Sequence, residues 1–142
     1  MYERLISYLP DLEGEHQQFG EWIIDQKNDG SPEHPFHMPF VRFGPVMEGI
    51  YNAVYDIVEQ HRELDLFSYQ DILKARGIDW DGRQMKEVDV SEWDAQGVLA
   101  LMLGIIRADR FSEGTFKAFL ENGCYAKWIR RLKEIEDEEE KG

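Results

Sequence analysis

The densest group of side chains that could take part in chemistry lies in the segment R-A-D-R-F-S-E-G, residues 107–114. Arginine guanidinium groups bind carboxylates and phosphates through paired hydrogen bonds. Carboxylates can accept a proton or orient a reacting group. The segment therefore predicts a binding site for an anionic small molecule, or an enzyme site, formed by four residues: Arg107, Asp109, Arg110 and Glu113.

The same four side chains also have a structural interpretation. If the preceding helix continues, Arg107 and Arg110 are i,i+3 neighbours, and Asp109 and Glu113 are i,i+4 neighbours, so a four-charge network is feasible. An arginine would then hold a corner between two helices by binding loop carbonyls and a carboxylate. No nucleophile adjoins the group, and ion-pair networks that only stabilise a fold resemble functional sites. We therefore favour the structural role and lean against an enzyme.

A proline-rich segment between Ser31 and Pro45 contains aromatic side chains that could form a binding surface. Exposed aromatic residues beside polar ones commonly anchor protein interfaces. The leading functional hypothesis is accordingly a non-enzymatic interaction or regulatory module that binds an unknown protein partner or a second copy of itself. Its candidate surface residues are Phe36, His37, Phe40 and Trp80.

Two histidines, His34 and His37, are weak candidates for metal ligands. The prolines around them disfavour a helix that would bring both onto one face, and no cysteine or clear third ligand adjoins them. Cys124 is the only cysteine, so an intrachain disulfide is excluded, and a reducing cytoplasm fits best. We expect no metal and no other cofactor.

The charge and hydropathy of the chain exclude several classes of partner. The formal net charge is -13, whereas a nucleic-acid surface requires a positive stripe that displaces counterions from phosphates. The longest apolar run, residues 98–106, is much shorter than the ~20 residues that span a bilayer. No export signal is visible at the N-terminus. The sequence therefore predicts a cytoplasmic protein that binds neither nucleic acid nor membrane.

Helical periodicity dominates the elements that must position these residues. Ser91 and Asp94 resemble a capping box before the most apolar helix, and Gly97 and Gly104, seven residues apart, predict that another backbone approaches it closely. Residues 38–43, M-P-F-V-R-F, indicate an extended segment, and residues 78–90 indicate a loop. Helices are predicted over residues 15–27, 45–61, between Ser68 and Gly77, and over 95–108, 116–120 and 125–135.

These elements predict an all-α, or mainly α, fold in one domain. We expect an orthogonal bundle of about six helices, covered by the long proline-rich loop, with at most a minimal strand pair. The helical domain should comprise residues 1–137. Residues 138–142 should form an acidic disordered tail, because charge runs at chain ends usually stay solvated.

Residues 94–114, D-A-Q-G-V-L-A-L-M-L-G-I-I-R-A-D-R-F-S-E-G, resemble the hallmark of the bacterial domain of unknown function family 6508. Members of that family usually read A-I-x-R-x-E-R-F-C-D-G. Ser112 and Glu113 replace the frequent Cys and Asp, so a catalytic thiol is not expected there. The family has no agreed activity, so the resemblance implies relatives but no function. Similar pieces are D-G-S-P-E-H-P-F-H-M-P-F from Asp29, the Tyr51 and Tyr55 helix, S-Y-Q-D-I-L at Ser68, and K-W-I-R-R-L-K-E-I-E near the end.

Overall fold

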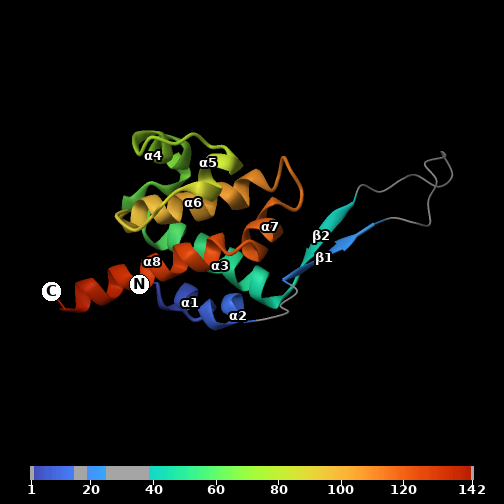
Figure 1. The fold of residues 1–142 in the computed structure, drawn as a ribbon, viewed down its shortest axis with the longest axis horizontal. Helices are drawn as coiled ribbons and strands as arrows, with labels where there is room; N and C mark the ends of the chain where they lie inside the picture. Colours follow the sequence, from blue (N-terminus) through green and yellow to red (C-terminus); the bar gives the residue numbers. More distant parts are fainter. Residues whose placement is uncertain (1, 15–18, 25–38, 142) are drawn as a thin grey trace.

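A computed structural model describes residues 2–14, 19–24 and 39–141 of the chain. The fold is mainly α-helical, with one antiparallel pair of strands that extends away from the helical bundle (Figure 1). This architecture confirms the predicted fold class. The elements are α1 (Glu3–Ile6), α2 (Leu9–Glu13), β1 (Gly20–Ile23), β2 (Phe40–Phe43), α3 (Pro45–Gln60), the 3-10 helices η1 (Arg62–Leu64) and η2 (Leu66–Ser68), α4 (Tyr69–Ala75), α5 (Gly82–Glu87), α6 (Ala95–Ala108), α7 (Thr115–Glu121) and α8 (Cys124–Lys141).

Helix α6 is the centre of the hydrophobic core, as its sequence predicts. Every residue from Gly97 to Ile106 is buried, and helices α3, α4, α7 and α8 all pack against α6. Apolar residues on nearly every face make such a helix stable only when neighbours surround it. Helix α6 packs against α3, and the predicted charged segment begins at its C-terminal end.

Asp94 begins α6 by capping the helix. Its side chain accepts a hydrogen bond from the Gly97 amide at 3.0 Å, which satisfies one of the amides that have no partner inside a helix. Ser91 lies three residues before this cap, and its amide donates to the Asp89 carboxylate at 2.9 Å. The start of the helix was therefore predicted correctly, but Asp94 is its N-cap.

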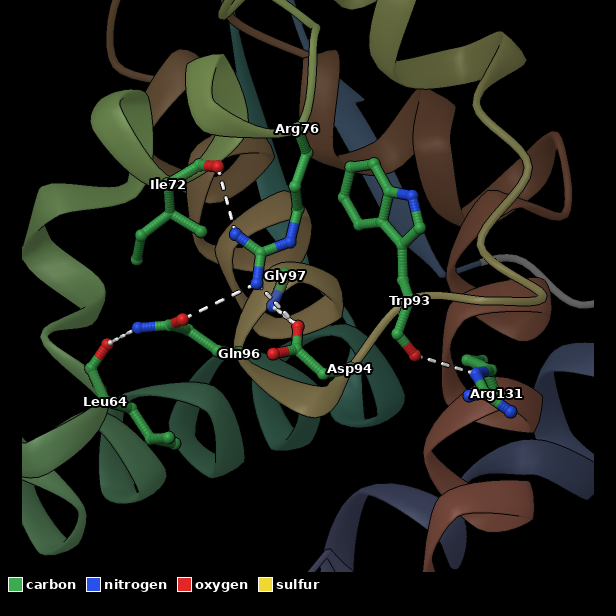
Figure 2. A network of polar contacts seen from close by, with 8 residues as sticks. All are labelled: Leu64, Ile72, Arg76, Trp93, Asp94, Gln96, Gly97 and Arg131. Atoms are coloured by element: carbon green, nitrogen blue, oxygen red, sulfur yellow. Dashed lines mark hydrogen bonds and ion pairs between the residues drawn. The ribbon is translucent and has the colours of Figure 1, made fainter.

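A polar network around Arg76 attaches α4 to the start of α6 (Figure 2). The guanidinium donates to the Ile72 carbonyl at 3.1 Å and to the Asp94 carboxylate at 2.6 Å. It also lies 5.7 Å from the centre of the Trp93 ring, within the range of a cation–π interaction. Arg131 of α8 donates to the Trp93 carbonyl at 2.9 Å. This network anchors one end of the core helix, opposite the end that carries the candidate site.

Side chains of other residues pack against the two glycines of α6. The sequence predicted that another backbone would approach there, and this prediction is wrong in that detail. A Cβ atom added at Gly97 would lie 2.5 Å from Nε of Arg76. One added at Gly104 would lie 3.0 Å from Cε of Met85 and 3.5 Å from the Trp80 ring. The space is therefore filled by long side chains from α4, from α5 and from the segment between them.

The helix predicted over residues 15–27 is wrong in its described part, because residues 20–23 form strand β1. The pairing is antiparallel, with Trp22 opposite Val41 and Ile23 opposite Phe40. Phe19, Trp22 and Ile23 have helical spacing, but the extended segment at residues 40–43 offers backbone partners that a lone helix would not use. Strand β2 confirms the extended segment that the sequence predicted there.

A helix replaces part of the loop that was predicted over residues 78–90. Helix α5 is short, and the Asp81 side chain caps it by accepting from the Arg83 amide at 2.9 Å. Met85 is buried and fixes the helix to the core. Short helices of this kind depend on tertiary contacts, since isolated turns are unstable. The two N-terminal helices, α1 and α2, were likewise not predicted.

Helix α8 continues to Lys141 and so includes residues 138–141, which were expected to lie in a disordered tail. Its last turns extend past the rest of the bundle (Figure 1). Arg131 pairs with Glu134 at 3.2 Å and with Glu138 at 3.7 Å, which supports the acidic turns at helical spacing. Within the described part of the chain, no helix has both the length and the apolar character required to cross a bilayer.

Candidate functional site

The four predicted charged residues lie at the corner between α6 and α7, next to β2 and α3. A cavity of about 310 Å³ opens there, which we call the corner pocket. Arg107 does not line the pocket, but the other three predicted residues do. The pocket is lined by Phe43, Tyr51, Tyr55, Ile106, Asp109, Arg110 and Glu113.

Asp109 joins α6 to α7 through backbone hydrogen bonds. Its Oδ1 atom accepts from the Gly114 amide at 3.0 Å and from the Phe116 amide at 3.1 Å. These amides belong to the first turn of α7, where helix donors have no internal partner. One oxygen of Asp109 is therefore committed to the fold, which agrees with the structural interpretation for this residue.

Glu113 is a second carboxyl group in the pocket and lies beside Asp109. Partial burial raises the pKa of Glu113, and the charge of Asp109 and a hydrogen bond with that carboxylate raise it further. Hydrogen bonds with the backbone of Val41 and Gly114 act in the opposite direction and do not cancel the rise. Glu113 consequently holds its proton to a higher pH than a free glutamate, as expected when two carboxyl groups share a site.

Arg107 is half-buried and faces tyrosines instead of the two carboxylates. Hydrogen bonding to Tyr55, and more weakly to Tyr69, raises the pKa of Arg107. Tyr55 belongs to α3 and Tyr69 to α4, so the guanidinium connects the end of α6 to both helices. The position of Arg107 between these tyrosines favours the structural interpretation for this residue.

Arg110 is exposed at the rim of the corner pocket. Among the described residues, no side chain forms a hydrogen bond or an ion pair with its guanidinium. Its positive charge lies near Tyr51, whose pKa it lowers against the larger effect of burial, which raises that pKa. The predicted four-charge network thus does not form within the described residues, and Arg110 is the charged group that the fold leaves available.

Two tyrosines and a phenylalanine complete the pocket, and the sequence analysis did not assign them to it. Tyr51 and Tyr55 are one helical turn apart on α3, and their ring centres are 4.8 Å apart. Phe43 of β2 packs edge-on against Tyr51, with 5.8 Å between the ring centres. The i,i+4 spacing of the tyrosines was visible in the sequence, but nothing local indicated that they face the segment at residues 107–114.

The candidate interaction residues are distributed differently. Phe36 and His37 lie outside the described residues, as does His34. Phe40 is exposed on β2, in agreement with a surface role. Trp80 is half-buried instead, because its indole Nε1 donates to the Gly104 carbonyl at 2.9 Å and its ring packs 5.5 Å from that of Tyr69.

Metal and thiol chemistry gain no support from the described residues. Within residues 2–14, 19–24 and 39–140, no three His, Cys, Asp or Glu side chains are grouped so that they could hold a metal ion. The candidate ligands His34 and His37 fall outside those ranges. Cys124 is buried, and this burial raises the pKa of its thiol and disfavours the reactive thiolate.

Replacing Arg110 with alanine should leave the melting temperature almost unchanged. Exposed side chains without partners change stability by at most ~0.5 kcal/mol, which is about 1–2 °C at ~2–4 °C per kcal/mol. Asp109→Ala is the matched comparison and should lower the melting temperature by roughly 1–8 °C, because loss of a helix cap costs ~0.5–2 kcal/mol. Circular dichroism melts of both variants measure this. A large loss for Arg110→Ala would restore its structural interpretation.

Fold and site together define a small, mainly helical domain with a polar pocket between its central helix and a two-stranded sheet. The chain belongs to a family of unknown function, DUF6508, whose model matches residues 1–138. The resemblance inferred from the sequence is thereby confirmed. Neither the curated proteins nor the solved structures compared with the chain give a match.

Proposed function

We propose that this protein binds a small molecule that carries an anionic group, and that the corner pocket is its binding site. The observation that supports the proposal is Arg110, an exposed guanidinium on a pocket wall with no side-chain partner among the described residues. Because no side chain in the described part of the chain holds this guanidinium, it is free to bind a ligand in the pocket. Guanidinium groups recognise carboxylates and phosphates through paired hydrogen bonds.

The other walls of the pocket suit a ligand of limited size. Tyr51 and Tyr55 supply hydroxyl groups that could orient a polar ligand, and Phe43 supplies an apolar surface. The volume of about 310 Å³ lies at the lower end of the range for small-molecule sites, roughly 300–1,000 Å³. The pocket therefore suits a metabolite of a few carbon atoms better than a nucleotide.

Binding of anionic metabolites tests this proposal. A panel of small carboxylates and phosphate esters should contain a compound that raises the melting temperature and binds in isothermal titration calorimetry. Arg110→Gln should weaken that binding by about 10-fold to 100-fold, because a hydrogen bond to a charged group contributes ~1.5–3 kcal/mol. Arg83→Gln removes another exposed guanidinium, on α5, and should bind like the wild type.

Two results would contradict a binding role for the pocket. One is a panel without any hit in either assay. The other is equal binding by Arg110→Gln and by the wild type. Melting curves of both variants show whether each is folded, so a loss of binding cannot be mistaken for unfolding.

A protein-interaction module remains the second candidate, because strands β1 and β2 carry exposed aromatic side chains beside charged ones. Ile23 and Phe40 lie directly opposite each other, so they share one face of the strand pair, and 46% of Phe40 is exposed. The other face carries Val41, which is buried. The strand pair extends from the bundle (Figure 1), where it would be accessible to a protein partner or to a second copy of the chain.

Substituting serine for both Phe36 and Phe40 tests the second candidate. If the face binds a partner, the double variant should lose a protein that the wild type captures in a pull-down, or lose an oligomer seen by light scattering. Phe67→Ser is the control, since Phe67 is 61% exposed on η2, away from the strands. Unchanged partners and unchanged oligomeric state in the double variant would remove this candidate.

A further inference from the structure

We propose that the ligand of the corner pocket is a small zwitterion, with an anionic group that binds Arg110 and an ammonium group that binds Glu113 beside Asp109. Amino acids and close analogues have this chemistry. The inference rests on the proposed function and adds the second charged group of the ligand. It follows from the fact that the pocket carries both signs of charge.

No basic side chain in the described part of the chain compensates the charge of the carboxyl pair. Asp109 and Glu113 both line the corner pocket, and Asp109 contributes to the raised pKa of Glu113. Among the described residues, no arginine or lysine forms an ion pair with either of them. Two ionised carboxylates in one pocket repel each other, which favours a proton on one of them. A ligand ammonium would replace that proton and pair with both oxygens.

A ligand with only a negative charge would interact favourably with Arg110 but not with the two carboxyl groups of the pocket. Its anionic group would bind Arg110, but the rest of the molecule would lie next to Glu113 and Asp109. Ionised carboxylates repel such a ligand, and the effect is stronger inside a pocket than in water. An ammonium on the same molecule reverses the sign of this interaction, so the pocket is complementary to a dipolar ligand.

The aromatic wall also favours a cationic group. Phe43, Tyr51 and Tyr55 line the pocket next to the carboxyl pair. The Phe43 and Tyr51 rings meet edge-on at 67°, so the two rings do not stack face to face. Ammonium groups are attracted to aromatic faces within about 6 Å of the ring centre. The same wall would also pack against the short carbon chain of an amino acid.

The protonation of Glu113 predicts how affinity changes with pH. The titratable groups that line the pocket with the carboxyl pair are Arg110, Tyr51 and Tyr55, and the buried Tyr125 of α8 lies near Asp109. An ammonium binds the ionised Glu113, so its affinity should rise as pH rises through the elevated pKa of that carboxyl. A simple anion prefers the protonated form, so its affinity should fall over the same interval.

Matched triads of ligands test the proposal in calorimetry. Each triad contains an amino acid, the 2-hydroxy acid that lacks the ammonium, and the amine that lacks the carboxylate; leucine, 2-hydroxyisocaproate and isoamylamine are one example. At pH 7 at least one amino acid should bind ten-fold or more tightly than both analogues. Its affinity should increase as pH rises through the elevated pKa of Glu113, and that of simple carboxylates should decrease.

Two variants that each replace a charged side chain with glutamine show which residue binds which charged group of the ligand. Arg110→Gln and Glu113→Gln should each weaken binding of the amino acid at least ten-fold, whereas only Arg110→Gln should weaken binding of the hydroxy acid. Arg83→Gln and Glu92→Gln remove exposed charges elsewhere and should bind like the wild type. Melting curves confirm that all four variants are folded.

The results distinguish a failure of the zwitterion proposal from a failure of the proposed anion-binding function. If the hydroxy acid binds as tightly as the amino acid, and Arg110→Gln weakens the binding of both, the zwitterion proposal is wrong but the proposed anion site is supported. If the amine binds as tightly as the amino acid, or if nothing in the panel binds, both proposals are wrong.

Discussion

Replacing Trp128 with alanine is expected to lower the melting temperature by roughly 6–20 °C. Trp128 lies on α8 and is fully buried, with its ring 5.1 Å from that of Tyr125 and 6.0 Å from that of Phe119. Truncating such a residue costs ~3–5 kcal/mol through lost burial and the cavity that remains. At this chain length each kcal/mol corresponds to about 2–4 °C. Calorimetry or a circular dichroism melt measures the loss.

Trp128→Phe is the matched control for that experiment. In the described part of the chain, no group accepts a hydrogen bond from the buried indole Nε1 of Trp128. Phenylalanine keeps most of the ring and removes a donor whose burial is costly without a partner, so these effects partly offset each other. The phenylalanine variant should lose much less stability than the alanine variant. Equal losses would show that the indole ring is not packed as described.

Replacing Gly114 with alanine should cause the second large effect, a fall of the melting temperature by roughly 4–24 °C. The φ angle of Gly114 is +95°, which L-residues rarely adopt, and an added Cβ would lie 2.4 Å from Cζ2 of Trp22. Backbone strain costs ~1–3 kcal/mol and overpacking a further ~1–3 kcal/mol, at about 2–4 °C per kcal/mol. The Gly114 amide also donates to Asp109, so the corner pocket should be distorted and ligand affinity reduced.

Gly123→Ala separates the two contributions. Gly123 has a similar φ angle of +89°, but nothing lies within 4 Å of an added Cβ. This variant should show only the strain, so it should melt at a higher temperature than Gly114→Ala. Combining Gly114→Ala with Trp22→Ala should recover part of the difference. If the two glycine variants melt at the same temperature, Trp22 does not pack against Gly114 as the structure has it.

The sequence alone was sufficient to predict where the long helices form. Helices α3, α6 and α8 have apolar residues at regular helical spacing, and that pattern is a local property of the chain. The pattern failed for β1, because strand pairing depends on residues 40–43, about twenty positions away. It also failed for α5, which depends on the burial of Met85 in a core that other segments form.

For the candidate site, the sequence by itself determined which segment carries the charges, and the tertiary structure decided what each charge does. Arg107, Asp109, Arg110 and Glu113 are close in the chain, so their proximity required no fold. Their roles depend on partners from other elements, such as the tyrosines of α3 and the amides of α7. Hydrogen bonds and ion pairs act over a few ångströms, and only folding brings distant segments within that range. In the folded chain Arg107 and Asp109 interact with groups of other elements, whereas Arg110 lies at the pocket without a side-chain partner among the described residues.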